Sequence, residues 1–374
     1  MADHARHPRN SHDAAHSATR SATNSAIDAL MPSTSDAALA ESTTGEMLRA
    51  IVEGRGLKIP KDLMSGIGGE GAATLWKLNA AQTLVISHTS REAAIDDAFE
   101  CGRIAATAAL TSIHARAAAP LFARLICECP AAASDAARKS LVEGVAVAMS
   151  DAGAVLADAQ VVDAPSLRFD VLVAGIVRPD RVRGIAGAQP ADVLVLASPL
   201  GAGIYATANA KGRLSDDDRR VLIAHATRPN RLGVALGTIQ NVHAVAEVGP
   251  QGLIAAALAI ARAAALTATL DVRHVPALAH ALSLAKSGCV APLSSRNWNR
   301  DGASVRLDET VMPEMRALLT DPQASGALLI SCKRESVGRV LKLCENEAGT
   351  HAGEVGSLAS EVARAETTRW LTIG

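Results

Sequence analysis

The chain has 374 residues, of which 49% are hydrophobic, 20% are charged and only 2% are aromatic. Its formal net charge of −1 gives no electrostatic reason to expect a nucleic acid or an anionic membrane as a partner. Six scattered cysteines without a CxxC pair, in a long chain without a visible signal peptide, lead us to expect reduced thiols and a cytoplasmic protein.

The first residues have a different composition from the remainder. Residues 1–42 are rich in Ser, Ala, Thr, Asn, His and Asp and lack apolar periodicity, so we predict a disordered tail. Order is predicted to begin at residues 43–54. Thr43 and Glu46 there have the spacing of a helix-capping box, and apolar residues then recur at helical spacing.

The N-terminal half alternates predicted strands with predicted helices. Strands are expected at residues 82–88, 121–129, 155–164 and 168–177, and helices at about 92–116 and 133–152. Strands rich in β-branched residues with short turns predict an α+β unit built on a mixed or antiparallel sheet. A connecting segment rich in Pro and Gly near residue 180 predicts a boundary between two domains, 43–180 and 181–374.

The second half predicts an α/β domain. Helices are expected at residues 215–227, 252–266, 275–287, 310–318 and 334–348, and strands at 193–198, 268–274 and 326–332. The longest apolar stretch, 252–270, is Ala-rich and interrupted by Arg262. It therefore predicts a helix that leads into a strand and not a membrane span.

Five segments, in order along residues 45 to about 360, resemble selenophosphate synthetases (selenide, water dikinases) of the aminoimidazole-ribonucleotide-synthetase-like (PurM-like) superfamily. They are GRGLKIPKDL (54–63), IDDAFECGRIAATAAL (95–110), DVLVLASPLGAGI (192–204), SGCVAPLSSRN (287–297) and LTDPQASGALLIS (319–331). The resemblance implies a two-domain fold and a dimer formed by the N-terminal sheets. It also implies ATP and Mg²⁺ sites and phosphoryl transfer to selenide.

The glycine-rich segment parallels the catalytic loop of that family, which carries a Cys or selenocysteine, a second Cys and an essential Lys. Here these positions hold Arg55, Leu57 and Lys58, so only the lysine is retained and no thiol is present. An arginine is neither nucleophilic nor a soft ligand. Two interpretations of Arg55 and Lys58 remain open, a small cationic nest that binds an anion and a solvated loop.

Most positions that would hold nucleotide or metal in that family are substituted. By the resemblance, these positions are occupied here by Glu70, Gly71, Thr89, Ser112, Gln160 and Glu247. Magnesium prefers hard oxygen ligands, mainly carboxylates. Glu247, the counterpart of a family aspartate, remains a candidate metal ligand. His114 and Arg116 bring positive charge to this region or belong to a relaxed surface.

Two other pairs of residues carry alternatives. Cys127 and Cys129 lie on one face of a predicted strand and are either a replacement thiol pair or core cysteines. Asp321 and Ser325, in the near-C-terminal segment, are predicted to brace a turn and not to touch a ligand.

The leading interpretation is a selenophosphate-synthetase-like protein with a degenerate active site that acts in binding or regulation. We expect a homodimer or a heterodimer with an active paralogue, with ATP and Mg²⁺ only implied by the resemblance. The alternative is a nucleotide-binding enzyme of the same superfamily that acts on selenide or another acceptor. In that case Lys58, Arg55 and Glu247 would be its charges.

Overall fold

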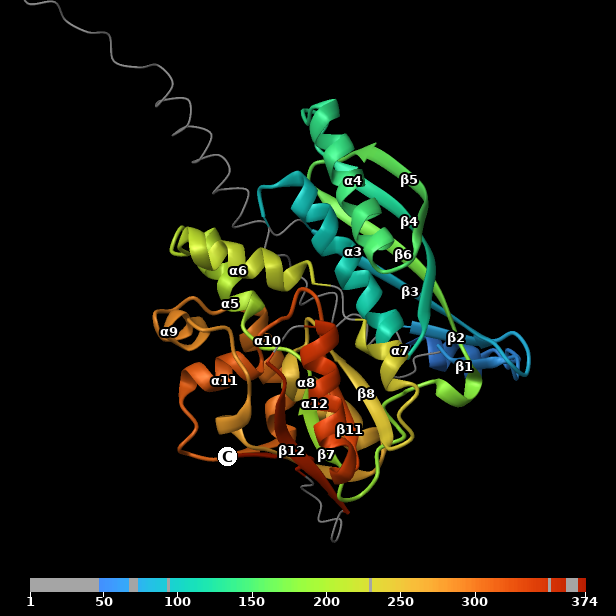
Figure 1. Cartoon of the computed structure of the whole chain (residues 1–374), viewed down its shortest axis with the longest axis vertical. Coiled ribbons are helices and arrows are strands. Elements are labelled where there is room, and N and C mark those ends of the chain that lie inside the picture. Colours follow the sequence, from blue (N-terminus) through green and yellow to red (C-terminus); the bar gives the residue numbers. More distant parts are fainter. Residues whose placement is uncertain (1–46, 67–72, 93–94, 229–230, 349–350, 361–368) are drawn as a thin grey trace, which may run out of the picture.

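The structure is a computed structural model that describes residues 47–66, 73–92, 95–228, 231–348, 351–360 and 369–374. It contains a six-stranded sheet from the N-terminal half and a seven-stranded sheet from the C-terminal half (Figure 1). The two sheets lie on either side of the predicted boundary near residue 180, and the division into two domains there stays a prediction. The predicted tail (1–42) and the capping box (Thr43 and Glu46) are outside the described residues.

The N-terminal sheet has the strand order β1-β2-β3-β6-β4-β5. Its strands are β1 (Leu63–Ser65), β2 (Ala73–Lys77), β3 (Thr83–Glu92), β4 (Ala119–Cys129), β5 (Val155–Asp163) and β6 (Arg168–Val177). Only β4 and β5 pair in parallel, and the other neighbours are antiparallel, so the prediction of a mixed sheet is confirmed.

Two helices, α3 (Ala98–Ala115) and α4 (Asp135–Asp151), cover one face of this sheet (Figure 1). Each begins at a capping side chain, since Asp97 accepts a hydrogen bond from the Glu100 N–H and Ser134 accepts one from the Ala137 N–H. The face of the sheet beneath α3 is apolar, with alternate residues of β3, β4 and β6 buried in one cluster.

The opposite face of the N-terminal sheet, here called the outer face, carries no described helix. Strand alternation places a set of apolar side chains on it: Trp76, Leu84, Ile86, Phe122, Ile126, Val155, Val162, Leu172 and Ile176. Five of these side chains are largely exposed to solvent, with exposed fractions from 37% for Trp76 to 59% for Val155. The resemblance assigns a dimer interface to this sheet, which stays a prediction.

The C-terminal sheet has the order β10-β13-β9-β12-β7-β11-β8. Its strands are β7 (Val193–Leu196), β8 (Val242–Val248), β9 (Leu266–Leu270), β10 (Val305–Leu307), β11 (Ala327–Cys332), β12 (Gly353–Ser360) and β13 (Leu371–Ile373). One face packs against α8 (Gly252–Ala263) in the largest apolar cluster, and the other packs against α7 (Leu232–Leu236) and α12 (Val337–Ala348).

Further helices surround this sheet: α5 (Ala202–Ala210), α6 (Asp216–Ala226), α9 (Ala281–Lys286), α10 (Pro292–Asp301) and α11 (Pro313–Leu319). The apolar stretch 252–270 forms α8 followed by β9, as predicted. None of the helices in the described part of the chain is long and apolar enough to cross a membrane.

Two predicted elements of the second half are wrong in part. The expected helix at 275–287 begins only at Ala281, because Pro276 lacks an N–H and Ala277 bridges to Leu200. The expected strand at 268–274 ends at Leu270. Asp271 there caps a short 3₁₀ turn by accepting a hydrogen bond from the Arg273 N–H.

Candidate functional site

The glycine-rich segment forms the end of a helix. Residues 47–54 are helical, and Gly56 takes a left-handed φ of 60°. The N–H of Leu57 donates to the Val52 carbonyl over 2.9 Å, which is the hydrogen bond of a Schellman helix end. The N–H groups of Arg55 and Gly56 also donate to helix carbonyls. The backbone N–H groups of residues 55–57 are therefore occupied and are not available to bind an anion. The two interpretations of the Arg55 and Lys58 side chains, a cationic nest and a solvated loop, both stay predictions.

The strongest polar contact at the predicted metal positions joins the two halves of the chain. Ser112, on α3, donates its hydroxyl hydrogen to Oε2 of Glu247, on β8, over 2.7 Å. Next to them, the Gly326 N–H at the start of β11 donates to Thr111 Oγ1 over 3.3 Å. A Cβ at Gly326 would lie 2.6 Å from Thr111 Cγ2 and 3.0 Å from Glu247 Cγ, so only glycine fits there.

Thr89 and Gln160 lie on opposite faces of the N-terminal sheet. Thr89 follows the alternation of β3 on the side of Ser87, whose hydroxyl donates to the Ala109 carbonyl of α3. Gln160 is exposed on β5 opposite Ile126, an outer-face residue of β4. The structure therefore brings Ser112 and Glu247 together but does not bring Gln160 to them.

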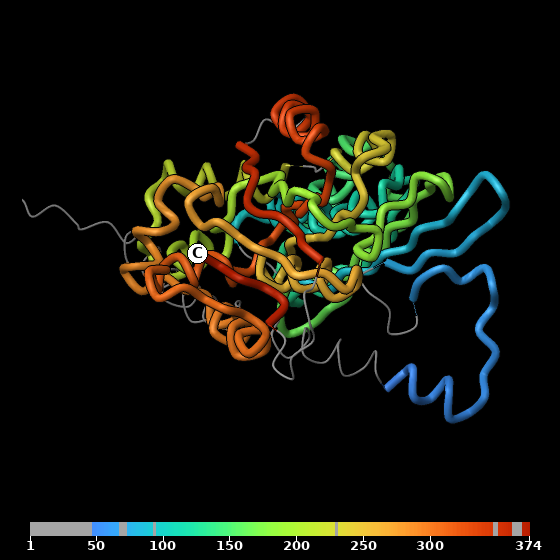
Figure 2. Tube along the Cα trace, turned by 90° about the horizontal axis from the view of Figure 1, so that it is seen from below, coloured from blue at the N-terminus to red at the C-terminus, as the bar shows by residue number. Residues whose placement is uncertain are grey.

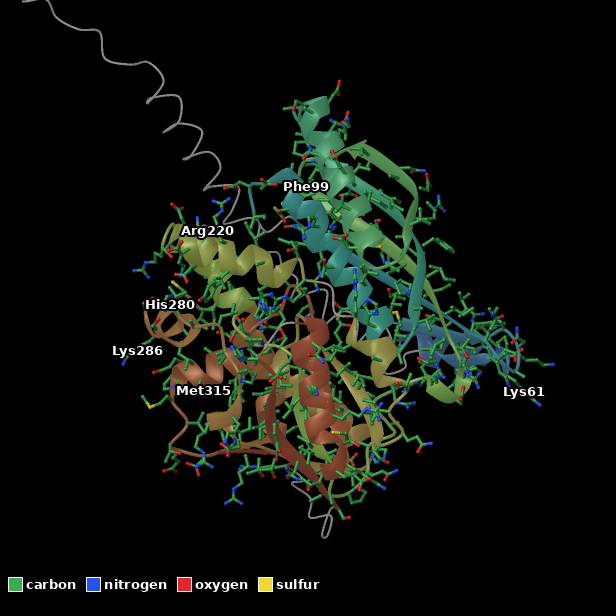
Figure 3. All side chains as sticks on the ribbon, viewed as in Figure 1. Lys61, Phe99, Arg220, His280, Lys286 and Met315 are labelled. Atoms are coloured by element: carbon green, nitrogen blue, oxygen red, sulfur yellow. The ribbon has the colours of Figure 1, made fainter. Side chains whose placement is uncertain are left out.

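Lys58 and Arg55 are exposed, and no hydrogen bond or ion pair joins either side chain to Ser112 or Glu247. Figure 3 shows Lys61, three residues after Lys58, at the outer edge of the molecule beside β1 and β2. Glu70 and Gly71 are outside the described residues. Among the residues that the structure describes, no group of three or more His, Cys, Asp or Glu side chains is placed to hold a metal ion.

His114 and Arg116 are buried, with exposed fractions of 2% and 6%, so the expectation of a relaxed surface is wrong. Burial, with a further contribution from Arg231, lowers the pKa of His114 to about 4. The imidazole is therefore neutral near pH 7. Arg116 donates to the Arg183 carbonyl over 3.5 Å.

Asp321 and Ser325 brace the fold, as predicted. Asp321 Oδ2 accepts hydrogen bonds from the Gly203 N–H over 2.9 Å and from the Gln323 amide over 3.0 Å, and it thereby caps the start of α5. Complete burial raises the pKa of this carboxyl well above its usual range. The Ser325 hydroxyl donates to the His225 carbonyl over 3.2 Å.

The cysteine pair belongs to the core. Cys127 and Cys129 are 0% and 1% exposed beneath the helices of the N-terminal sheet. Burial, reinforced by the neighbouring Cys129, raises the pKa of Cys127 to about 12, so its thiol stays protonated near neutral pH. The structure supports the core alternative over a reactive thiol pair.

A polar network in the C-terminal half has no signal in the sequence. The buried carboxylate of Asp192 accepts a hydrogen bond from the Ser331 hydroxyl over 2.6 Å and contacts His243 Nδ1 at 2.9 Å. His243 is 51 positions and Ser331 is 139 positions from Asp192 along the chain, so no local spacing connects the three residues. The network ties β7, β8 and β11 together at one end of the sheet.

Comparison with known proteins agrees with this architecture. Residues 189–364 match the family model described as AIR synthase related protein, C-terminal domain. A crystal structure of thiamine-monophosphate kinase from Stenotrophomonas maltophilia superposes with a TM-score of 0.62 at 18% identity, over 86% of this chain and 94% of that chain. The fold is therefore that of the PurM-like class, with mixed α/β structure and two sheets.

Proteins similar in sequence identify the family within this fold class. The selenide, water dikinase of Paraburkholderia xenovorans is 36% identical over 307 residues, which cover 82% of this chain and 86% of the relative. The selenide, water dikinase of Pseudomonas straminea is 35% identical over 299 residues, which cover 79% of this chain and 84% of the relative. The chain belongs to the selenide, water dikinase family.

Proposed function

We propose that this chain is a selenide, water dikinase homologue that does not transfer a phosphoryl group from ATP to selenide and that acts in binding or regulation. The observation that carries the proposal is the hydrogen bond from Ser112 to Glu247. The family resemblance expects a carboxylate at each of these positions, and this chain has a neutral hydroxyl at one of them.

The residues at these positions do not fit magnesium-bound ATP. Phosphoryl transfer depends on divalent ions that neutralise the phosphates, and those ions need carboxylate ligands. Glu247 supplies one carboxylate, and one of its oxygens already accepts the hydrogen bond from Ser112. Thr89 adds a neutral hydroxyl on β3, and Gln160 faces the other side of the sheet.

The selenium-handling loop also lacks its chemistry. Arg55 and Leu57 replace the two positions at which the family has Cys or selenocysteine, and Lys58 is the retained cation. All six cysteines of the chain are buried, so none substitutes for the missing thiol on that loop. A soft anion such as selenide therefore meets no soft nucleophile there.

The chain keeps the family's fold and has an apolar outer face on its N-terminal sheet. Apolar side chains on an open sheet face are typical of a protein-protein interface. The proposed assembly is a homodimer through the outer face of the N-terminal sheet. A heterodimer with a catalytically active paralogue would use the same surface, and in it this chain would regulate the active subunit.

The test is incubation of the purified chain with ATP, Mg²⁺ and selenide, followed by phosphorus NMR. The expected result is neither AMP nor selenophosphate, under conditions in which the Paraburkholderia xenovorans relative forms both. Turnover that disappears in Lys58→Ala would overturn the proposal and would favour the phosphotransferase alternative.

A thermal-shift titration with ATP and Mg²⁺ separates loss of binding from loss of chemistry. Ligand binding to the native state stabilises it by RT ln(1 + [L]/Kd), so a retained nucleotide site would raise the Tm with concentration. We expect no such rise. A rise that Glu247→Gln removed would identify a retained nucleotide-binding enzyme of another specificity.

A further inference from the structure

The edge of the N-terminal sheet at β5 is unpaired. Strand β5 pairs in parallel with β4 on one side, and no strand in the described part of the chain pairs with its other side. Beyond one register shift near Ala157, residues 158–163 stay in regular register with β4 and contain neither Pro nor Lys. Natural edge strands are often blunted by such residues, so this edge keeps backbone N–H and carbonyl groups that can pair with a further strand.

The two acidic residues of this stretch are each paired within the chain. Asp158 pairs with Arg124 at 2.5 Å, and Asp163 pairs with Arg138 at 2.7 Å. A paired carboxylate repels an approaching strand less than a free one, because a nearby cation offsets its charge. The charges on β5 therefore do not protect its edge.

Helix α4 runs beside β5 (Figure 1) and forms a hollow next to this edge. The hollow has a volume of about 540 Å³ and is lined by Arg138, Lys139, Val142, Glu143, Ala146 and Val161. The five helix residues lie four positions apart in two adjacent rows, so they form one stripe of α4. Val161 comes from β5, opposite Cys127 of β4, whose side chain is buried beneath the helices. The hollow is therefore on the helix side of the sheet.

The hollow has an apolar floor beside charges of opposite sign. Val142, Ala146 and Val161 are half-buried, and the two valines pack against the core of the N-terminal half. Lys139 and Glu143 are exposed beside this floor, about one helical turn apart, so their charges largely cancel. By charge complementarity, the hollow suits uncharged apolar side chains better than an acidic or a basic group.

We propose that β5 and this hollow bind an extended, uncharged segment of a partner protein. The segment adds a strand to the β5 edge, and its alternate apolar side chains cover Val142, Ala146 and Val161. Successive side chains of a strand point to opposite faces of the sheet, so every second side chain faces α4. Backbone pairing then supplies affinity, and the hollow selects the side chains. This inference goes beyond the proposed loss of phosphoryl transfer and does not depend on it.

The position of the hollow leaves it accessible to another protein. The outer face is on the opposite side of the sheet from α4, so a dimer through the outer face leaves the hollow open. Residues 47–66 lead into β1, at the other edge of the sheet from β5, and Figure 2 shows them standing off the body of the molecule. No described residue outside α4 and β5 lines the hollow.

The binding experiment uses the full-length chain and the peptide Ser-Thr-Val-Thr-Val-Thr-Val-Ser, with blocked ends and an uncharged fluorophore. Its valines form one apolar face at strand spacing, and the peptide carries no charge. Fluorescence anisotropy should show saturable binding that changes little with salt, because no ion pair contributes to it. Absence of saturable binding to the unmodified chain, or binding that salt abolishes, would overturn the inference.

A charge on the floor of the hollow tests where the peptide binds. Ala146→Glu should weaken binding about tenfold, because the valines of the peptide would then face a carboxylate. The matched control is Ala136→Glu, at an exposed residue of the same helix that does not line the hollow, and it should bind like the unmodified chain. Circular dichroism checks that both variants fold. Equal binding by the two variants would show that the peptide binds elsewhere and would contradict the inference.

Two methylated peptides test the strand pairing on the unmodified chain, without any variant. Along a strand, the N–H groups of alternate residues face the same neighbour. Methylation of the three valine nitrogens therefore removes one set of donors, and methylation of the three threonine nitrogens removes the other. One methylated peptide should bind about tenfold more weakly than the other. Equal affinities of the two would show that the backbone does not pair with β5, and the inference would fail.

Light scattering distinguishes a partner protein from a second copy of this chain on the same edge. The mass of the chain should be the same with and without Ala146→Glu. A mass that halves in Ala146→Glu would show that this edge joins two copies, and it would overturn the assignment to a partner protein.

Discussion

Gly102 of α3 and Gly144 of α4 lie against each other's helix, and the two backbones come closer than any side chain would allow. A Cβ at Gly144 would lie 2.0 Å from the Phe99 carbonyl oxygen, and one at Gly102 would lie 2.2 Å from that of Leu141. This contact fixes the two helices over the sheet that carries the outer face, and α3 in turn carries Ser112.

Gly144→Ala should therefore destabilise the chain by about 3 kcal/mol, because neither helix backbone can move without disturbing the core. The matched control is Gly338→Ala in α12, where no atom outside the glycine's own stretch of helix lies within 4 Å of the added Cβ. That change should leave stability unchanged or raise it by up to about 1 kcal/mol, since alanine is the better helix former. Urea unfolding followed by circular dichroism measures both. Equal stability of the two variants would contradict the close helix contact.

Ser112→Asp should create a site that responds to magnesium. A second carboxylate beside Glu247 adds like-charge repulsion, so the variant should be less stable than the unmodified chain in the presence of EDTA. Magnesium ions should then raise its Tm, because two carboxylates can share a divalent ion.

The control for that variant is Ser112→Ala, which removes the hydrogen bond to Glu247 without adding charge. It should lose about 1–2 kcal/mol of stability and show no response to magnesium. Should the unmodified chain show the same rise in Tm with magnesium as Ser112→Asp, the argument that its carboxylate set is incomplete would fail.

Acid should destabilise the protein through two buried histidines. Burial lowers the pKa of His114 and of His225 to about 4, from an ordinary value of 6.5. Because the native state binds fewer protons than the unfolded state, stability is complete above pH 6.5 and declines as the pH falls toward 4. Each histidine should lower the free energy of unfolding by about 2 kcal/mol when the pH falls from about 7 to about 5.

His114→Gln isolates this effect. The variant should lose less stability than the unmodified chain between these two pH values, by about 2 kcal/mol, in urea unfolding at each pH. His280→Gln is the control, since that imidazole is largely exposed and pairs with Asp218 at 2.9 Å. If His114→Gln followed the pH dependence of the unmodified chain, protonation of His114 would not be linked to unfolding.

The buried carboxyl of Asp321 predicts a pH dependence of stability with the opposite sign. Its pKa is raised well above the usual range, so the native state binds more protons than the unfolded state and stability falls as pH rises above the ordinary value of 3.8. Asp321→Asn keeps an acceptor for the Gly203 N–H and carries no charge. The variant should be the more stable protein at about pH 8, and its advantage should shrink as the pH approaches 4. A lower stability of Asp321→Asn at both pH values would show that the carboxyl is ionised in the native state.

Several features of the fold could be read from local sequence. The apolar alternation of β3, β4 and β6 and the long Ala-rich segment of α3 predicted a mixed sheet with helices, and both are present. The elements that were missed include the short β10, β13 and α7 and also the longer β8, β12, α5 and α10. The short ones have three to five residues, which carry too little periodicity to predict, and they are held by pairing with distant strands or by packing in a distant core.

The candidate site shows the same limit. The resemblance located Ser112 and Glu247, but only the tertiary structure places them 2.7 Å apart, 135 residues from one another in sequence. The N–H groups of residues 55–57 donate to the helix that precedes the glycine-rich loop, which the motif alone does not show. A relaxed surface around His114 and Arg116 was wrongly expected. These side chains are buried where α7 packs against α3, and a contact between segments so far apart has no signal in the local sequence.

The sequence by itself determined the family, the residue types at each family position and the order of the long helices and strands. These follow from composition, motifs and periodicity, which are properties of neighbouring residues. The tertiary structure alone decided which side chains meet across the two halves, which thiols and imidazoles are buried, and which face of the N-terminal sheet stays open. Those depend on contacts between segments far apart in the chain, and the desolvation and close packing at such contacts have no signature in a single stretch of sequence.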